Sequence, residues 1–291
     1  RRQRQMCIRD RIYPVASCND TDFQNLMSVY MDAVFHPNIY KHQEIFKQEG
    51  WHYELENEDD ELKINGVVYN EMKGAFSSPD EVLEREIMNH LFPDTTYGCE
   101  SGGDPKNIPD LTYENFLNFH RTYYHPSNSY IYLYGNMDME EKLAFLDEHY
   151  LSHFDYLDVD SVIQEQKAFG ACQDVTLEYP VAENEGEEDN TYLSYNMVVG
   201  NAADSQMAMA FEVLDYALLS APGAPLKQAL LDVKAGKDVY GSYDDGILQP
   251  YFTVIAKGSN PDRKEEFVSV IRQVLGDIVK NGIDRKAVEA G

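Results

Sequence analysis

Two histidines of the sequence are spaced so that they could bind one zinc ion together. His149 and His153 of HYLSH are four residues apart, which places both on one face of a helix, as in helical zinc pairs. The residues between them are Tyr150, Leu151 and Ser152, so the glutamate that such sites use in catalysis is missing. A surface or half-buried pair on an amphipathic helix is therefore the favoured interpretation.

Two other histidines have simpler interpretations. His120 lies near the apolar face of its expected helix, so we expect a histidine of the core rather than a ligand. His125 precedes Pro126, where a helix must stop, and we assign it no catalytic role.

A glycine pair could bring backbone close to a ligand. In ESGGDP, Gly102 and Gly103 precede Asp104 and Pro105, and such a loop can direct backbone N–H groups at a bound molecule. The stretch lacks the lysine of a phosphate-binding loop and the spacing of a dinucleotide-binding motif, so we reject both. A plain tight turn remains open, and Gly102 and Gly103 are weak candidates for substrate binding.

The stretch GVVYNEMKG, residues 66–74, offers one carboxylate. Its apolar run Val67–Tyr69 leads into Asn70 and Glu71. A single glutamate in a helix is solvated far more often than it is functional, and no periodicity distinguishes Glu71. The residues by themselves leave its role open.

The first ten residues, RRQRQMCIRD, differ from the rest of the chain. The whole sequence has 24 basic and 51 acidic residues, and outside this decamer 20 basic and 50 acidic residues leave a net charge of −30. A basic arm for nucleic acid or lipid is one interpretation, and a transit peptide, which would be rich in serine, is another. The decamer also back-translates to a DNA sequence that resembles the transposon adapter used in preparing sequencing libraries, and we expect this third origin.

Composition excludes several classes of protein. Outside the decamer the cysteines are Cys18, Cys99 and Cys172, an odd and scattered set that favours a reducing compartment over a secreted, disulfide-linked domain. The acidity argues against nucleic acid as a partner and permits basic peptides. No apolar run approaches the roughly 18 residues of a membrane span, so no membrane partner is expected.

Apolar periodicity predicts helices along most of the chain. The predicted helices cover residues 21–35, 77–92, 112–124 and 139–154, a segment around Met207–Leu218, a helix that Pro225 opens, and a long helix from Pro261 to Gly282. Thr21 with Gln24, and Ser78 with Glu81, have the spacing of capping boxes.

Predicted strands alternate with these helices in an order that suits antiparallel pairing. They cover residues 129–135, 174–179, 191–199, 238–243 and 250–256. Residues 155–173 show no apolar periodicity, which is typical of a linker. This order favours an α+β fold with sandwich domains over a doubly wound sheet.

Six stretches together carry a family resemblance. DFQNLMSVYMDAVFHP, FKQEGWHYE, GVVYNEMKGAFSSPD, YGCESGGDP, YYHPSNSYIYLYGNMD and GAPLKQALLD…GKDVYGSYDDG follow one another in this order. The sequence resembles the presequence-protease branch of the pitrilysin and insulin-degrading metallopeptidases from Tyr13 to Gly291.

The resemblance implies a zinc endopeptidase with related α+β domains in two halves that close around a chamber in which unfolded peptides are cut. Zinc is held there by two histidines of an HxxEH motif and by a distant glutamate, which Glu71 of NEMKG matches. The glutamate inside HxxEH serves as general base. The partners implied are peptide substrates and the C-terminal half of the same polypeptide, in bacterial cytoplasm or an organelle matrix.

The sequence departs from that pattern in one respect, since none of its eight histidines forms HxxEH. We expect the motif, and with it the general base, upstream, and the chain alone to be inactive. The domains expected are an adapter at 1–10, the later part of an incomplete catalytic domain at 11–155, a linker at 156–173 and a second, non-catalytic domain at 174–291. The alternative is a non-catalytic structural or binding subunit of the same fold.

If residues 1–10 are a translated adapter, they evolved no packing partners. Their deletion should leave the melting temperature of the chain unchanged, which a thermal scan of both forms measures. A clear fall in melting temperature on deletion would contradict this origin.

Overall fold

The computed structural model of the protein describes residues 11–181 and 186–291. Contacts divide the chain into two compact units. The first comprises the chain up to Ser78 together with Glu100–Val162, and the second comprises Pro79–Cys99 together with Ile163–Gly291. The expected adapter at 1–10 lies outside the described residues.

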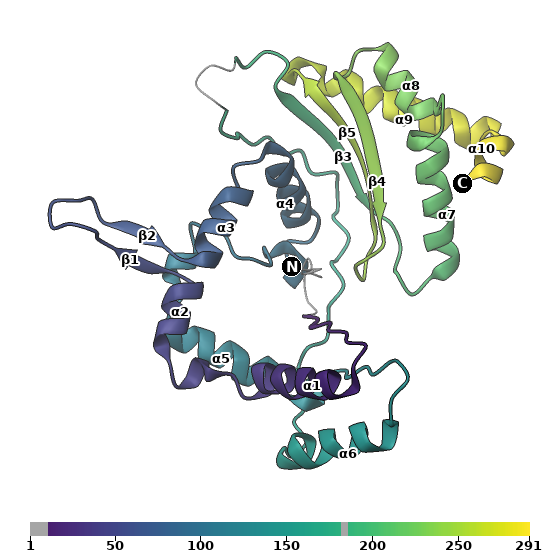
Figure 1. Ribbon diagram of the computed structural model, residues 1–291. Coiled ribbons are helices and arrows are strands. Elements are labelled where there is room, and N and C mark those ends of the chain that lie inside the picture. The colour runs from purple at the N-terminus through teal and green to yellow at the C-terminus, as the bar shows by residue number, and fades with distance from the viewer. Residues whose placement is uncertain (1–10, 182–185) are drawn as a thin grey trace. The chain divides into compact units, whose positions relative to one another are not determined.

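The first unit is mainly helical (Figure 1). Its elements are α1 (Asp20–Phe35), α2 (Gln43–Glu49), β1 (His52–Glu54), β2 (Lys63–Asn65), α3 (Val67–Ala75), α5 (Tyr113–Tyr123) and α6 (Met139–His149). Strands β1 and β2 form an antiparallel pair that the sequence patterns did not predict, because three-residue strands are too short to show alternation. The pair leads directly into α3.

Helices α1 and α5 of the first unit begin where a side chain caps a free N–H group. Helix α1 begins one residue earlier than predicted, because the side chain of Asn19, rather than Thr21, accepts a hydrogen bond from the Asp22 N–H. The predicted capping box of Thr21 and Gln24 is therefore wrong. Helix α5 carries a true capping box, formed by Thr112 and Asn115.

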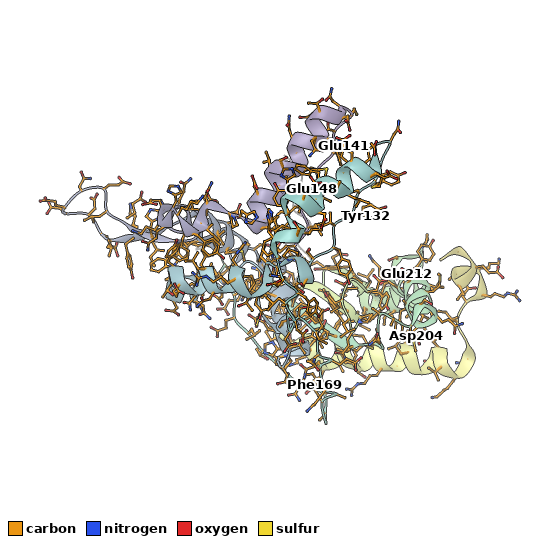
Figure 2. All side chains as sticks on the ribbon, turned by 90° about the horizontal axis from the view of Figure 1, so that it is seen from below. Tyr132, Glu141, Glu148, Phe169, Asp204 and Glu212 are labelled. Carbon is orange, nitrogen blue, oxygen red and sulfur yellow. The ribbon has the colours of Figure 1, made fainter. Side chains whose placement is uncertain are left out.

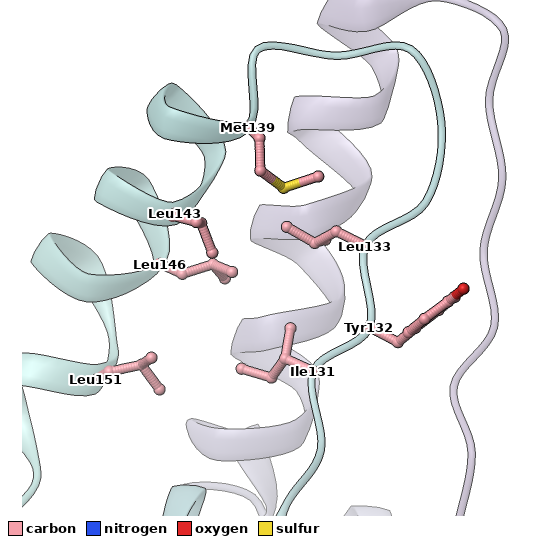
Figure 3. Close-up of a pocket in the computed structure, with 7 residues that line it drawn as sticks. All are labelled: Ile131, Tyr132, Leu133, Met139, Leu143, Leu146 and Leu151. Atoms are coloured by element: carbon pink, nitrogen blue, oxygen red, sulfur yellow. The ribbon is translucent and has the colours of Figure 1, made fainter.

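The strand predicted at 129–135 is not formed. Tyr130, Tyr132 and Tyr134 are almost fully exposed, while Ile131 and Leu133 face an apolar pocket against α6 (Figure 3). This alternation is that of a strand. Among the described residues, however, no other segment forms backbone hydrogen bonds with it. A high β propensity of one segment does not by itself produce a strand, because a strand needs a neighbouring strand to pair with.

The helix predicted at 139–154 ends at His149, and a 3-10 turn covers Leu151–His153. His149 and His153 therefore do not share one α-helical face. Tyr150, between them, is buried, and its hydroxyl hydrogen-bonds Asp32 of α1 at 3.1 Å. Burial, followed by the Asp32 carboxylate, raises the pKa of Tyr150 to about 12.

The second unit is built on a three-stranded antiparallel sheet. Its elements are α4 (Pro79–Leu91), β3 (Thr191–Val198), α7 (Ser205–Asp215), a π-helical turn (Tyr216–Ser220), α8 (Pro225–Asp232), β4 (Asp238–Asp244), β5 (Tyr251–Ser259), α9 (Lys264–Asn281) and α10 (Arg285–Ala290). The strand order is β3-β5-β4, so the last strand in sequence lies at the centre. This mixed architecture confirms the α+β prediction.

One face of the sheet carries the core. Phe252, Val254 and Ala256 alternate along β5 and pack with Leu226 of α8 and Ile271 of α9, on the side where Figure 1 shows α7, α8 and α9. Period-two alternation along the strand and period-3.6 spacing along the helices bring these side chains together.

The opposite face of the sheet receives α4 and the residues after it. Phe92 is fully buried, with its ring 5.7 Å from Tyr97 and 6.2 Å from Tyr251 of β5. The Tyr97 hydroxyl accepts a hydrogen bond of 2.9 Å from the Leu248 N–H. Residues 79–99 therefore belong to the second unit, although residues 100–162 of the first unit follow them in sequence.

The strand predicted at 174–179 is also not formed, since no described residue pairs with it in a sheet. Val175 and Leu177 are exposed there. The domain boundaries expected at 155 and 174 stay a prediction about the complete protein. Within the described ranges, no helix is long and apolar enough to cross a bilayer.

Replacing Phe92 by alanine should destabilise the second unit by about 3–5 kcal/mol, because it empties a buried aromatic site between α4 and β5. Hydrogen exchange of the β5 amides under native conditions measures this unit by itself. The control is Phe169→Ala in the same unit. Its side chain is 40% exposed, so the cost should stay near 0.5 kcal/mol. Equal effects of the two variants would contradict the burial of residues 79–99 in this unit.

Candidate functional site

Glu71 lies on α3, in the middle of the helix, and its side chain is exposed. Among the described residues it forms no hydrogen bond and no ion pair. A carboxylate that is neither buried nor paired remains available to an external cation or donor. Its direction is set by the backbone of α3 rather than by a neighbouring side chain.

The start of α3 is fixed by a close backbone contact. Gly66, the residue before the helix, has φ +156°, and a Cβ there would lie 2.2 Å from the Gly50 carbonyl oxygen. Because only glycine permits this approach, the Gly50 carbonyl can accept a hydrogen bond of 3.3 Å from the Tyr69 N–H. One of the unpaired N–H groups of the helix start is satisfied in this way.

A short chain of polar side chains reinforces this start. The side-chain oxygen of Asn65, Oδ1, accepts hydrogen bonds from the Gly66 N–H at 2.8 Å and from the side-chain amide of Asn70 at 2.6 Å. The Asn65 amide in turn donates to Glu54 of β1 at 2.8 Å. The β1–β2 pair and the first turn of α3 are thereby joined directly before Glu71.

The glycine loop predicted as a weak ligand site packs beside the same helix. A Cβ on Gly102 would lie 2.1 Å from Sδ of Met72, the residue after Glu71. Gly103 has φ +89°, a conformation that favours glycine, and it packs on the buried Ile108. The structure therefore gives both glycines a packing role, and their role in substrate binding stays a prediction.

His120 lies in the first unit as a structural histidine. Its Nε2 donates to the Val34 carbonyl at 2.8 Å, so Nδ1 accepts from the Tyr40 hydroxyl at 2.7 Å. Burial lowers the pKa of His120, which keeps the neutral ring required by this pattern. The interpretation as a core histidine rather than a ligand agrees with these contacts.

A zinc site needs three protein ligands, and the described residues provide no group of three histidine, cysteine, aspartate or glutamate side chains that could hold a metal ion. Glu71 is exposed and unpaired on α3, so it could supply one oxygen ligand, and its role as a ligand stays a prediction. Sequence patterns missed the anchoring residues Gly50, Asn65 and Gly66. Gly66 directly before an apolar run was the one available signal.

Comparison with known proteins identifies the family. The family model described as the peptidase M16 inactive domain matches residues 110–291. The chain belongs to the peptidase M16 family. It is 54% identical over 279 residues to protein HypA of Clostridium perfringens, and 40% identical over 282 residues to presequence protease 1, chloroplastic/mitochondrial, of Arabidopsis thaliana. These matches confirm the resemblance to presequence proteases.

Both alignments cover 96% of this chain, but only 29% of the Clostridium protein and 26% of the Arabidopsis protein. Two solved structures share the fold at 18% identity and a TM-score of 0.52. An M16-like peptidase from Alicyclobacillus acidocaldarius matches over 77% of this chain and 52% of its own. A peptidase M16 inactive domain from Pseudomonas fluorescens matches over 77% and 53%.

Substituting alanine for Gly102 should destabilise the first unit by about 1–3 kcal/mol, because the new methyl group overlaps the Met72 side chain. The control is Gly74→Ala on α3, where no atom lies within 4 Å of the new Cβ. This change should stabilise by about 0.5–1 kcal/mol. Hydrogen exchange of the α3 amides measures both.

The double variant Gly102→Ala with Met72→Ala distinguishes overlap with the Met72 side chain from strain in the backbone at residue 102. Its cost should be smaller than the sum of the two single costs, because the overlapping side chain is gone. Additive costs would show that Gly102 does not contact Met72.

Proposed function

We propose that this chain is part of a zinc metalloendopeptidase that degrades unfolded, presequence-like peptides inside a closed chamber. The observation that carries the proposal is the 40% identity to a presequence protease over 96% of the chain. The C-terminal half of the same polypeptide would complete the chamber. Bacterial cytoplasm or an organelle matrix is the proposed compartment, and the names of the presequence proteases, chloroplastic/mitochondrial and mitochondrial, support an organelle.

Glu71 would supply one oxygen ligand to zinc. When bound, zinc acidifies a water molecule and polarises the scissile carbonyl. The contribution of this chain is to hold the carboxylate unpaired and outward on α3, through the contacts of Gly66 and Asn65 at the helix start. Since the sequence contains no HxxEH, two further ligands and the general base would come from residues outside this sequence.

A non-catalytic structural or binding subunit is the second candidate. It is favoured by the description of the family model as an inactive domain, which covers residues 110–291 but not Glu71. An HxxEH motif elsewhere in the same polypeptide would favour the enzyme, and its absence from that polypeptide would favour the subunit.

The charge of the chain suggests the substrate class. Exposed carboxylates are spread over both units, for example Glu141 and Glu148 on α6, Asp204 just before α7 and Glu212 on that helix (Figure 2). A surface with this excess of negative charge concentrates cationic ligands. Basic peptides are therefore the proposed substrates.

Glu71→Gln in a full-length protein that contains residues 11–291 should preserve the fold and remove most peptidase activity and bound zinc. The amide is nearly isosteric but neutral, so the loss of affinity should at least reach the 10–100-fold typical of changes around a metal ligand. Zinc content and peptide hydrolysis measure the effect. The 291-residue chain alone should show neither tight zinc binding nor hydrolysis.

The matched control is Glu81→Gln, an exposed glutamate in the first turn of α4, which should change neither zinc content nor turnover. If Glu71→Gln retains full zinc and unchanged turnover, Glu71 is an ordinary helical glutamate.

The same full-length protein should cleave basic unfolded peptides faster than acidic ones of equal length. Added salt should reduce the difference, because the screening length falls from about 30 Å at 0.01 M to about 10 Å at 0.1 M. Rates with paired lysine-rich and glutamate-rich peptides at both salt concentrations measure this. Equal rates at low salt would rule out selection by charge.

A further inference from the structure

Two asparagines of the sequence are directly followed by glycine, in Asn65–Gly66 and in Asn281–Gly282. In such a dipeptide the glycine nitrogen can attack the side-chain amide of the asparagine before it, because glycine has no side chain that shields its nitrogen. The first pair lies at the start of α3 and the second at the end of α9. Their hydrogen bonds decide which of the two is arranged to react in the folded chain.

At residue 66 the fold leaves no alternative to glycine. A Cβ there would lie 2.2 Å from the Gly50 carbonyl oxygen, so any side chain at this position would overlap the backbone at Gly50. The contact that fixes the start of α3 therefore also places an unshielded nitrogen directly after Asn65.

The hydrogen bonds of Asn65 bring the reacting groups together. Its Oδ1 accepts from the Gly66 N–H at 2.8 Å, so the Gly66 nitrogen lies beside the side-chain amide that it would attack. The same Oδ1 accepts from the Asn70 side-chain amide at 2.6 Å. Negative charge develops on this oxygen when Cγ of Asn65 is attacked, and a donor already in contact with it lowers the cost of that charge.

The second pair has the opposite arrangement. Asn281 is the last residue of α9, and the Gly282 N–H donates to the Ile278 carbonyl at 2.8 Å. A nitrogen in such a helical hydrogen bond is directed along the helix, away from the side chain of the preceding residue. Asn281 is exposed, whereas Asn65 is only half-exposed. Exposure alone would thus favour reaction at Asn281, while the hydrogen bonds favour Asn65.

We propose that Asn65–Gly66 is a self-modifying site, at which Asn65 is converted to aspartate or isoaspartate with Asn70 as the donor to the reacting oxygen. The Gly66 nitrogen forms a bond to Cγ of Asn65, the Cγ–Nδ2 bond breaks, and the Gly66 amide proton leaves with Nδ2 as ammonia. Water then opens the resulting succinimide at either carbonyl. Water is the one co-reactant consumed.

The modification weakens the start of α3. In the unmodified chain the Asn65 side-chain amide donates to Glu54 of β1 at 2.8 Å. After the reaction a carboxylate faces Glu54, so this hydrogen bond is replaced by repulsion between like charges. Isoaspartate also adds a methylene to the backbone between β2 and α3. The site thus acts as an irreversible switch on the anchoring of α3, whether or not Glu71 binds zinc.

The first test compares the two asparagine–glycine pairs in the 291-residue chain, folded and then unfolded in guanidinium chloride. Peptide mapping by mass spectrometry measures deamidation at Asn65 and Asn281 in the same sample. In the folded chain Asn65 should react about tenfold faster, because one hydrogen bond favours attack there and another opposes it at Asn281. Unfolding should remove most of this difference. Equal rates in the folded chain, or faster reaction at Asn281, would overturn the proposal.

Asn70→Ala should slow deamidation at Asn65 by about two- to tenfold, the rate equivalent of one hydrogen bond. The matched control is Asn118→Ala, which removes an exposed asparagine on α5 of the same unit and should leave the rate unchanged. If Asn70→Ala behaves like Asn118→Ala, Asn70 does not assist the attack and the proposal is wrong. The comparison of Asn65 with Asn281 needs no variant, so a folding defect of Asn70→Ala does not decide the result.

Asn65→Asp tests the effect of the modification on α3. It should accelerate hydrogen exchange of the Tyr69 and Asn70 amides by about two- to tenfold, because the contact with Glu54 is lost. The double variant Asn65→Asp with Glu54→Gln places an amide donor opposite the new carboxylate and should restore slow exchange. If Asn65→Asp exchanges like the unmodified chain, the site is not a switch on α3.

Discussion

The backbone contact between Gly50 and Gly66 is the constraint on which the candidate site depends. It sets where α3 begins, and the position of every side chain on α3, including Glu71 and Met72, follows from that start. At this contact the two backbones lie so close together that a side chain at residue 66 would overlap the Gly50 carbonyl. It joins the residue after α2 to the residue after β2, and the antiparallel β1–β2 pair lies between these two glycines in the chain.

The sequence predicted well those elements whose signals are local. The helices at α1, α5 and α9 and the strands β3, β4 and β5 lie close to their predicted ranges, because apolar period, caps and prolines act within a few residues. The segments at 129–135 and 174–179 show the limit of this reasoning. Strand propensity depends on the residues of one segment, whereas a β-strand forms only when a second segment pairs with it through backbone hydrogen bonds.

The site was less accessible to sequence reasoning than the fold. The candidate role of Glu71 rests on the family resemblance and not on periodicity, because an exposed glutamate on a short helix has no sequence pattern that distinguishes it from other glutamates. The contact of Gly102 with Met72, and that of Phe92 with Tyr251, join residues far apart in sequence. The sequence predicts a possible ligand loop at Gly102 and Gly103, whereas their packing against Met72 and Ile108 depends on contacts distant in sequence.

The extended segment at Tyr130–Tyr134 has a consequence for handling the protein. Residues 127–137 contain no charged side chain, three tyrosines are exposed there, and the backbone groups of 130–134 form no hydrogen bond among the described residues. Uncharged extended segments of this kind are templates for intermolecular cross-β association. Pairing between copies of this segment would therefore bring molecules together at high concentration against the repulsion of their net negative charge.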